Sequence, residues 1–353
     1  MDVKTELTRL AKITDKHLEV YFDEEIGRNF GFNQRQKKLV KKLLEHAKEH
    51  NLRSAKRLRA SFVYYSYLLG GKKANKRIFR AAAAIELVHT ALLIHDDFMD
   101  QDELRRGGIT SHKFLARGSK HYGEAMAVDL GDAVLSWGYE MLNRCDFRTK
   151  LVNKAVGHLL RTAIKTGWGQ AMDLNLEKEK KWTEDDVLTT HRAKTAIYTY
   201  ENPLMVGAIL GELSEEVKEI LTEYARWGGI AFQLQDDILG LFGNPEKTGK
   251  SADSDLLQGK RTLLMLVALK QGSESDVGAI MKVWGKRRAN KDDLKKAKEA
   301  VKKSGSLDYS IRISRQYAKR AVDVAEKLRK YELNKKAIDY IQGIAAYMVE
   351  RDV

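Results

Sequence analysis

The sequence predicts an all-α protein, a single-domain helical bundle, on three observations. Only two prolines, Pro203 and Pro245, occur in 353 residues, and proline is the residue least compatible with a helix interior. Long stretches are rich in Ala, Leu, Lys and Glu, which favour helices. No low-complexity linker and no fixed-period repeat divides the chain, so we expect one domain over residues 1–353.

The helices are expected in the following order. Two amphipathic helices occupy residues 1–50, a basic turn covers 52–60, and a helix follows at 61–71. The segment from Arg77 to Asp100 is almost continuously apolar, so we expect it to be central and surrounded by other helices. Further helices are expected at about 123–145, 150–175, 184–211 and 214–240, then a Gly- and Lys-rich loop at 243–260, then helices over most of the remainder.

The net charge of +14, from 63 Lys and Arg against 49 Asp and Glu, suggests anionic partners. Phosphorylated metabolites, nucleic acid and anionic lipid are all partners of this kind. Many lysines lie in mixed runs such as KKLLEHAKEH, which are typical of solvated helix faces. The chain has no zinc-finger spacing and no RNA-recognition motif, so we expect no nucleic-acid partner.

Cysteine content and hydropathy indicate a cytoplasmic protein. Cys145 is the single cysteine, which excludes an internal disulfide framework and fits a reducing compartment. The first residues, MDVKTELTRLAKITDKH, have no apolar core, so we expect no signal peptide. No stretch approaches about eighteen uncharged apolar residues, so we also expect no transmembrane segment.

An acidic cluster ends the central apolar helix, with five acids in the eight residues from Asp96 to Glu103. Asp96 and Asp100 share one helix face, and Asp97 is offset by about 100°. Carboxylates stacked beside apolar surface are costly unless they are neutralised, and Mg²⁺ shared with substrate phosphates would neutralise them. The alternative for an isolated cluster of this kind is a frayed, solvated helix end.

A second acidic pair makes that alternative less attractive. Asp236 and Asp237 end another largely apolar helix, and Gln233 lies one turn before Asp236. Two apolar helices that both end in paired aspartates suggest acidic rims on one cavity, where bridging metal ions would hold a diphosphate.

Basic residues accompany both acidic motifs. Arginine forks and lysine point charges recognise phosphates together, although any single one is more often a solvated surface residue. These residues are Lys56, Arg57 and Arg59 in the early turn, Arg105 and Arg106 after the first motif, Lys194, and Lys250 and Lys260 after the second motif. His89 lies seven residues before Asp96 and roughly on its face. Alone, a histidine there would more often be a satisfied core residue than a ligand.

The order of these motifs resembles the trans-isoprenyl diphosphate synthases, also called polyprenyl synthetases. The similar segments are KRLR, ELVHTALLIHDDFMDQDELRRG, GQAMDL, AKT, FQLQDDILGLFG and SDLLQGKRTLL, between about residues 53 and 264. A late segment, KKSGSLDYSIRISRQYAKRA at 302–321, is also similar. The resemblance implies an isoprenoid-synthase-type helical bundle around a central cavity and a short-chain trans-prenyltransferase that condenses isopentenyl diphosphate with allylic diphosphates.

The resemblance also assigns roles to residues. It implies Mg²⁺, typically three ions, held by Asp96, Asp97, Asp100, Asp236 and Asp237. Together with these aspartates, the residues that would draw off pyrophosphate are Arg105, Lys194 and Lys260. Isopentenyl diphosphate would be bound by Lys56, Arg59, His89 and Arg106. The remaining residues that would line the site or bind diphosphate are Gln170, Asp173, Thr195, Gln233 and Lys250.

The sequence departs from the family pattern at the second motif, which reads DDILG, so that Gly240 stands in place of a third carboxylate. Product length should depend on the residues below Asp96 and on the following helix, which we expect to be Val88, Ala91, Leu92, Met126 and Trp137. Because Ala91 is small, we expect geranylgeranyl diphosphate, with twenty carbons, ahead of products with fifteen or twenty-five. The resemblance further implies a homodimer formed through long helices.

Three other interpretations compete with the prenyltransferase that the resemblance implies. A non-catalytic regulatory subunit of a heteromeric prenyl synthase would share the fold, but such subunits tend to lose aspartates that this chain retains. A terpene cyclase or squalene-type synthase would not need the isopentenyl site that KRLR and His89 suggest. A basic scaffold for nucleic acid or a membrane surface has only the net charge in its favour.

Overall fold

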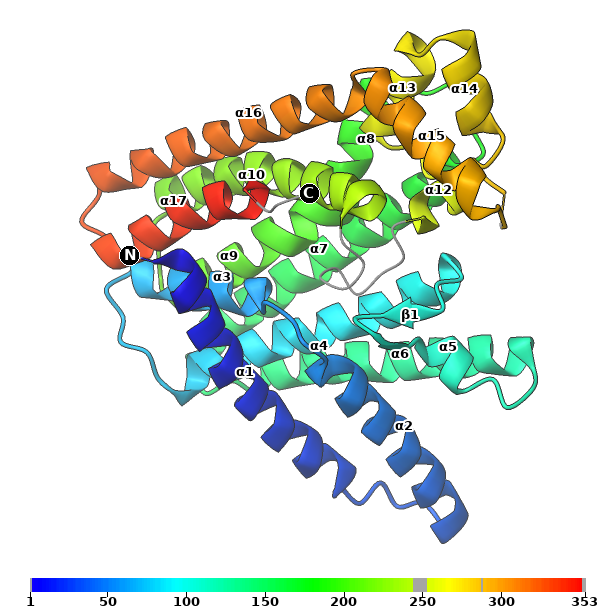
Figure 1. Cartoon of the computed structure of the whole chain (residues 1–353). Helices are drawn as coiled ribbons and strands as arrows, with labels where there is room; N and C mark the ends of the chain where they lie inside the picture. The colour runs from blue at the N-terminus through cyan, green and yellow to red at the C-terminus, as the bar shows by residue number, and fades with distance from the viewer. Residues whose placement is uncertain (1, 244–252, 287, 351–353) are drawn as a thin grey trace. The chain divides into compact units, whose positions relative to one another are not determined.

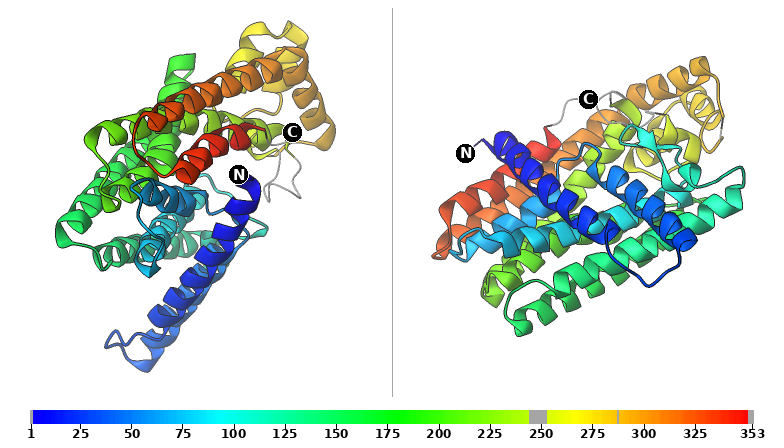
Figure 2. Two further views of the ribbon diagram at one scale, coloured as in Figure 1. Left: turned by 90° about the vertical axis from the view of Figure 1, so that its left-hand side faces the viewer. Right: turned by 90° about the horizontal axis from the view of Figure 1, so that it is seen from below.

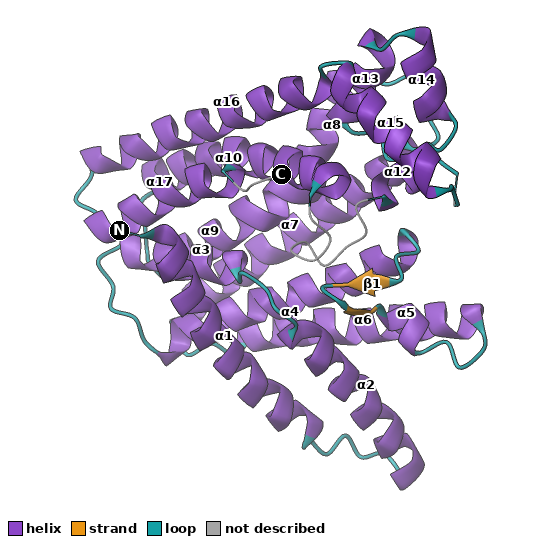
Figure 3. Ribbon diagram, in the orientation of Figure 1, coloured by secondary structure: helices purple, strands orange, loops and turns teal. Residues whose placement is uncertain are grey.

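The structure is a computed structural model that describes residues 2–243, 253–286 and 288–350. The structure is 78% helical, with almost no strands in the described residues (Figure 3), which confirms the all-α prediction. The chain forms two compact units. We call residues 2–156 with 206–212 the first unit, and residues 157–205 with 213 onward the second unit. A single domain stays a prediction, and each unit is described by itself.

The first unit, whose elements α1 to α6 and β1 are labelled in Figure 1, contains the aspartates of the first acidic motif. Its elements are α1 (Val3–Ile26), α2 (Gln34–Leu52), α3 (Leu58–Leu69), α4 (Lys76–Met99), β1 (Leu104–Arg105), β2 (Gly108–Ile109), α5 (Ser111–Phe114) and α6 (Lys120–Asn143), with the first part of α7 (Thr149–Leu176) and most of α9 (Asn202–Leu210). Helices α1 and α2 lie side by side in both views of Figure 2.

The second unit contains the second acidic motif, near the end of α10. Its elements are the rest of α7, α8 (Glu184–His191), η1 (Arg192–Glu201), the start of α9, α10 (Glu215–Phe242), α12 (Ser254–Gln258), α13 (Leu263–Gln271), α14 (Glu274–Met281), α15 (Lys291–Lys303), α16 (Ser306–Glu326), η2 (Lys327–Lys330) and α17 (Lys335–Val349).

Helix α4 is the core helix of the first unit, as its sequence predicts. Asn75 caps its start by accepting hydrogen bonds from the backbone N–H groups of Arg77 and Ile78. Two glycines of α6 let α4 approach closely: a Cβ on Gly138 would lie 2.6 Å from Cγ2 of Val88, and a Cβ on Gly131 would overlap the His95 ring. The close packing of α4 on α6 therefore fixes the direction in which the end of α4 presents its aspartates.

Helix α4 is long and apolar enough to cross a membrane by length and composition, although Glu86 interrupts its apolar run. Its most apolar stretch has a mean hydropathy of 1.4, and 72% of that stretch is buried inside the protein. A core helix of a globular protein meets the same criterion. The absence of a transmembrane segment stays a prediction.

Three local features differ from the predicted elements. The predicted helix at 184–211 is divided into α8, the π-helix η1 and α9, which follow one another without a break, and Pro203 comes just after the π-helix. A short hairpin, β1 with β2, follows the first acidic motif. The short helix α12 lies within the loop predicted at 243–260. Lys250 lies outside the described residues.

Candidate active site

The end of α4 separates the aspartates of the first motif into two kinds. Asp97 is fully buried, and the Nε of Arg105 donates a hydrogen bond to its Oδ1 at 2.5 Å. Oδ2 of Asp97 lies 3.5 Å from Nε2 of His50, from α2. Asp96 and Asp100 are half-buried and one turn apart at the helix end. The structure thus brings Asp96 and Asp100 onto the helix face that the sequence predicts, whereas Asp97 points into the protein.

Charge keeps the buried pair ionised. Burial alone would raise the pKa of Asp97, but Arg105 and His50 outweigh it and hold that pKa below its usual value. Burial opposes the charge of Arg105, but Asp97 and Asp96 raise its pKa above the usual value. Burial lowers the pKa of His50, so its ring is neutral at pH 7. Arg105 is therefore a fixed cation that contacts Asp96 and Asp102 as well, at 3.4 and 3.3 Å.

The β1–β2 hairpin directs Arg105 toward Asp97 and Arg106 toward His89. Its two turn residues, Arg106 and Gly107, both have positive φ, which matches the twist of a two-residue hairpin. Arg53 packs against Gly108 and donates hydrogen bonds to the carbonyl oxygens of Arg105 and Ile109 at 3.0 and 2.9 Å. Sequence reasoning missed the hairpin and Arg53, although RRGG carries a turn signal.

Basic residues of the predicted isopentenyl site meet around His89. Its Nε2 lies 3.1 Å from Nη1 of Arg59 and 3.4 Å from Nη2 of Arg106. Burial, with Arg59 and Arg106 adding to it, lowers the pKa of His89 well below its usual value, so the neutral ring accepts from both guanidinium groups. Burial also lowers the pKa of Arg106 to about 10, which still leaves it charged at pH 7. The side chain of Lys56 is exposed on the loop before α3.

Arg57 has a structural role that the sequence did not reveal. Its φ of 50° is left-handed, and its side chain is buried. Its Nε donates to Oδ1 of Asp15 at 2.6 Å, and Nη1 donates to Oε2 of Glu86 at 3.2 Å. Oε1 of Glu86 accepts from the backbone N–H of Ala60 at 3.1 Å. Arg57 therefore fixes the turn that presents Lys56 and Arg59.

The second motif repeats the division seen in the first. Asp237 is buried, with Nε2 of Gln233 donating to its Oδ1 at 2.8 Å and Nε2 of His191 lying 3.1 Å from its Oδ2. Asp236 is half-buried beside it on α10. The Oγ1 of Thr195 donates to Oε1 of Gln233 at 2.6 Å. In both motifs the second aspartate is buried beside a histidine and the first lies closer to the surface.

Two predicted lysines of the second unit, Lys194 and Lys260, meet an acid of α7. Lys194, on the π-helix η1, donates to Oδ2 of Asp173 at 2.7 Å, and Lys260 lies 3.4 Å from the same oxygen. Lys260 also pairs with Glu177 at 2.8 Å. Gly169 makes this possible, because a Cβ there would overlap the backbone of η1 at Lys194.

Gln170 lies on α7 about one turn before Asp173 and is half-buried. The predicted chain-length residues lie on α4 and α6. Val88 and Ala91 are fully buried, while Leu92 and Met126 are half-buried. Trp137 of α6 is 9% exposed and meets the ring of Phe22 edge to face at 5.0 Å. Their role in product length stays a prediction.

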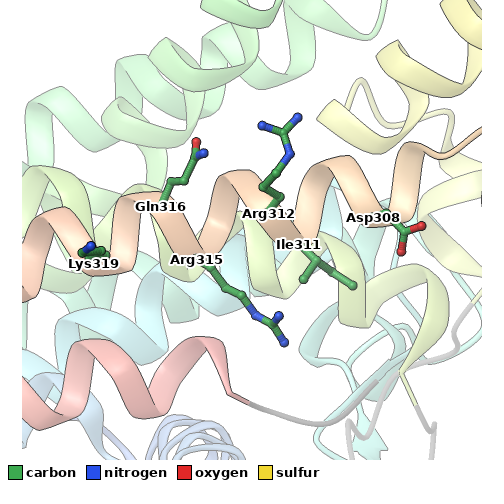
Figure 4. Close-up of a pocket in the computed structure, with 6 residues that line it drawn as sticks. All are labelled: Asp308, Ile311, Arg312, Arg315, Gln316 and Lys319. Carbon is green, nitrogen blue, oxygen red and sulfur yellow. The ribbon is translucent and has the colours of Figure 1, made fainter.

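A surface cavity of about 430 Å³ lies apart from all of these residues, on α16 (Figure 4). Arg312 and Gln316 project from one side of the helix, and Arg315 from the other. The lining residues are Asp308, Ile311, Arg312, Arg315, Gln316 and Lys319. None of them is among the predicted site residues.

The donor set fits Mg²⁺ better than a metal that needs a full protein cage. Within residues 2–243, 253–286 and 288–350, no three His, Cys, Asp or Glu side chains are grouped so that they alone would hold a metal ion. Asp96, Asp100 and Asp236 offer hard oxygen donors at two helix ends. Mg²⁺ commonly takes one or two carboxylates and completes its shell with water and substrate phosphates.

An all-α protein whose apolar helices end in aspartate pairs, with basic residues beside each pair, has the features of a diphosphate-handling enzyme. The polyprenyl synthetase family model matches residues 41–301, and the chain belongs to this family. It is a prenyl diphosphate synthase, which is a prenyltransferase. The prediction of the family from the sequence is confirmed.

Individual relatives agree with this assignment. The chain is 34% identical to geranylgeranyl diphosphate synthase of Saccharolobus solfataricus, over 95% of this chain and 98% of the relative. It is also 34% identical to geranylfarnesyl diphosphate synthase of Aeropyrum pernix, over 80% of this chain and 86% of the relative.

Two crystal structures share the fold over almost the whole chain. Geranylgeranyl pyrophosphate synthase of Corynebacterium glutamicum, with isoprenyl diphosphate and magnesium, has a TM-score of 0.88 at 24% identity and full coverage of both chains. Polyprenyl synthase of Caulobacter crescentus, with calcium and isoprenyl diphosphate, has a TM-score of 0.82 at 25% identity, covering 98% of this chain and 97% of the other. These comparisons give the regulatory-subunit alternative no support.

Proposed function

We propose that this protein is a geranylgeranyl diphosphate synthase that adds isopentenyl diphosphate to allylic diphosphates. The observation that carries the proposal is the arrangement around α4. Helix α4 carries His89, which contacts Arg59 and Arg106. The same helix ends in Asp96 and Asp100. A cationic site for one diphosphate and an acidic site for metal-bound diphosphate therefore belong to the same helix. A cyclase that acts on a single diphosphate has no use for the first of these sites.

Magnesium is the cofactor we infer, with three ions per site, and its chemistry is to stabilise the negative charge that develops on the leaving pyrophosphate. Support comes from the oxygen donors at both helix ends and from the calcium and isoprenyl diphosphate bound by the Caulobacter crescentus relative. We assign Asp96, Asp100 and Asp236 as direct ligands. Asp97 and Asp237 are assigned the role of fixing the helix ends, because each is held by a buried partner.

The chain's own cations would assist the departure of pyrophosphate. Arg105 presents a permanently charged guanidinium beside Asp96, while Lys194 and Lys260 share Asp173. As the allylic C–O bond breaks, these groups stabilise the oxygen charge. The double bond of isopentenyl diphosphate then attacks the allylic cation, and the released pyrophosphate accepts the proton that is lost. No side-chain base is needed for this step.

Isopentenyl diphosphate is assigned to Arg59, Arg106, His89 and Lys56. The neutral His89 accepts from both arginines and so directs their remaining N–H groups. Arginine forks match the geometry of diphosphate oxygens. Gln170, Thr195 and Gln233 keep their proposed roles in lining the site, as does Lys250, which lies outside the described residues.

A homodimer is part of the proposal, and α7 supplies its surface. Four apolar residues recur every four positions along α7 with 43–65% of their surface exposed: Leu160, Ile164, Trp168 and Met172. Such a stripe on one helix face is what a second copy of the chain would cover. We further propose a cytoplasmic protein without a nucleic-acid partner or membrane span, since most of α4 is buried.

Incorporation of labelled isopentenyl diphosphate tests the function. Dimethylallyl, geranyl and farnesyl diphosphate are supplied in turn with Mg²⁺, and the extracted product is measured for wild type, Asp96→Ala and Asp129→Ala. Asp129 is an exposed acid of α6 and serves as the matched control. We expect a twenty-carbon product that is lost in Asp96→Ala or with EDTA and kept in Asp129→Ala. A folded wild-type protein that makes no product from any primer would instead indicate the regulatory subunit.

A further inference from the structure

Lys260, one of the cations proposed to assist the departure of pyrophosphate, lies in a short loop. The loop joins α12 to α13 and begins at Gly259, whose φ of 78° is left-handed. From this loop the Lys260 side chain, which is 12% exposed, reaches Asp173 of α7 at 3.4 Å and Glu177, just after that helix, at 2.8 Å. A lysine side chain is flexible, so the place of its ammonium group depends on how firmly the loop is held.

Arg261, the next residue, belongs to a cluster with two tryptophans, which we call the Arg261 cluster: Arg261, Trp182 and Trp284. The guanidinium carbon lies 5.0 Å from the centre of the Trp182 ring and 4.1 Å from that of the Trp284 ring. The centres of the two rings are 5.5 Å apart. A guanidinium group over aromatic faces is attracted by the electrons of the rings, so the three side chains hold one another in place.

The Arg261 cluster holds the backbone of the loop on two sides. Nε1 of Trp284 donates a hydrogen bond to the carbonyl oxygen of Lys260 at 3.4 Å. Nη1 of Arg261 donates to the carbonyl oxygen of Gly259 at 2.6 Å, and Nη2 donates to that of Glu179 at 3.3 Å. The loop is therefore fixed to the segment after α14, through Trp284, and to the segment after α7, through Glu179.

The contacts of Arg261 lie on the stretch of chain that also carries a partner of Lys260. Asp173 is in the last turn of α7, and Glu179 and Trp182 follow that helix. The same stretch thus supplies an acid that Lys260 meets and two contacts of Arg261. The distance between the ammonium group and Asp173 therefore depends on the Arg261 cluster.

We propose that Trp182, Arg261 and Trp284 are positioning residues for Lys260. They act through the backbone of the loop and hold the ammonium group at Asp173. This inference rests on the proposed function, in which Lys260 stabilises the charge on the leaving pyrophosphate. The alternative is packing alone, because Trp182 lies against two apolar clusters of the second unit. The two explanations differ in whether the tryptophans still matter once Lys260 is removed.

A double-mutant cycle separates positioning from packing. Trp284→Phe keeps an aromatic ring and removes the N–H donor to the Lys260 carbonyl. Because a displacement of about 1 Å can cost about a hundred-fold in rate, we expect kcat/KM for the allylic diphosphate to fall about tenfold. The KM for isopentenyl diphosphate should stay within about twofold, since that substrate is assigned to other residues. In the Lys260→Ala background, Trp284→Phe should change kcat/KM by less than about twofold.

The matched control is Trp227→Phe, on α10. Trp227 also belongs to an arginine–tryptophan cluster, with Arg226 and Arg320 at 4.6 and 5.3 Å from its ring centre, and we expect kcat/KM equal to that of wild type. An unchanged kcat/KM in Trp284→Phe would overturn the proposal. A further loss of about tenfold in the Lys260→Ala background would also overturn it, because Trp284 would then act independently of Lys260. Should Trp284→Phe fail to fold, the same cycle with Arg261→Met, which removes the cation from both rings, decides on the same criteria.

Binding of pyrophosphate distinguishes failure of this inference from failure of the proposed function. Pyrophosphate with Mg²⁺ is titrated by calorimetry into wild type, Trp284→Phe, Lys260→Ala and the double variant. We expect several-fold weaker binding in Trp284→Phe than in wild type, and equal binding in the two variants that lack Lys260. If wild type synthesises prenyl diphosphate and Trp284→Phe matches it in both measurements, only this inference is refuted. If wild type makes no product, the titration still reports whether Trp284 acts through Lys260.

Discussion

Asp97 and Arg105 form a buried ion pair beneath the end of α4, with Nε of Arg105 donating to Oδ1 of Asp97 at 2.5 Å. Its neighbour Asp96 is half-buried and lies 3.4 Å from the same guanidinium group. Two adjacent aspartates of one motif therefore have different surroundings: Asp97 holds Arg105 in place, and Asp96 is the one that we propose as a metal ligand.

Substitution should separate these two tasks. Asp97→Asn leaves Arg105 buried without its main counter-ion, so we expect the free energy of unfolding to fall by about 3 kcal/mol. Asp96→Asn removes a partly exposed charge, so we expect a loss of about 1 kcal/mol or less, together with loss of prenyl transfer. Urea denaturation and the incorporation assay measure the two effects. Equal stability of the two variants would contradict the division of roles.

His89 should affect one substrate and not the other. His89→Phe keeps an aromatic ring and removes the acceptor that Arg59 and Arg106 share. A hydrogen bond to a charged group contributes about 1.5–3 kcal/mol, so we expect KM for isopentenyl diphosphate to rise about tenfold. The KM for the allylic diphosphate should stay within about twofold. The control is His17→Phe, whose ring stacks on Phe79 at 5.2 Å; a rise in both KM values for His89→Phe would point to general disruption instead.

The α7 stripe should determine the oligomeric state. Trp168→Asp places a charge on the most exposed apolar residue of the stripe, which is 65% exposed. Because the side chain is exposed in one copy, the subunit should still fold, and we expect the dimer to dissociate. Met281→Asp, on an apolar residue of α14 that is 48% exposed, is the control and should leave the dimer intact. Sedimentation velocity gives the mass of each variant; a dimer that persists in Trp168→Asp would exclude this surface.

Most of the fold and the class of enzyme were predictable from the sequence. The apolar run before Asp96 predicts a buried helix, and α4 begins and ends within a residue or so of the expected Arg77 and Asp100. The motifs gave the family, which the comparisons confirm. These features depend on residue type and short-range spacing, both of which a sequence displays directly.

The features that sequence reasoning missed depend on partners distant in the chain. The DDFMD spacing places Asp97 on another face from Asp96, but its contacts with Arg105 and with His50 of α2 cannot be read from the spacing. In the sequence, Arg57 is one more basic residue of KRLR. Its structural role follows from its contact with Glu86 of α4.

Acid should destabilise the protein through His46. This ring stacks on Phe114 at 4.2 Å, its Nε2 lies 3.0 Å from Oγ of Ser111, and burial lowers its pKa from 6.5 to about 4. The unfolded chain therefore binds a proton between about pH 6.5 and 4 that the folded protein does not. The contribution of His46 to the free energy of unfolding is complete above pH 6.5. It is lost as the pH falls from 6.5 to about 4, by up to about 3 kcal/mol.

The pH dependence of the free energy of unfolding tests whether His46 is responsible. His46→Gln cannot titrate, so its free energy of unfolding should vary less between pH 7.5 and 4.5 than that of wild type. His158→Gln is the comparison, because burial also lowers the pKa of His158 to about 4, and its loss should flatten the profile similarly. Parallel profiles for wild type and His46→Gln in urea denaturation would show that His46 does not carry the effect.

Trp137 should limit the length of the product. It is 9% exposed on α6, on the helix that packs against Val88 of α4, and it contacts Phe22. Trp137→Ala removes a large side chain, and we expect products longer than twenty carbons, with twenty-five the first to appear. The cavity should also lower the free energy of unfolding by about 3–5 kcal/mol, so the circular dichroism of the variant must be checked at the assay temperature. Trp137→Phe, which removes less volume, should give a smaller shift toward long products. An unchanged chain length from a folded Trp137→Ala protein would show that another residue forms the floor.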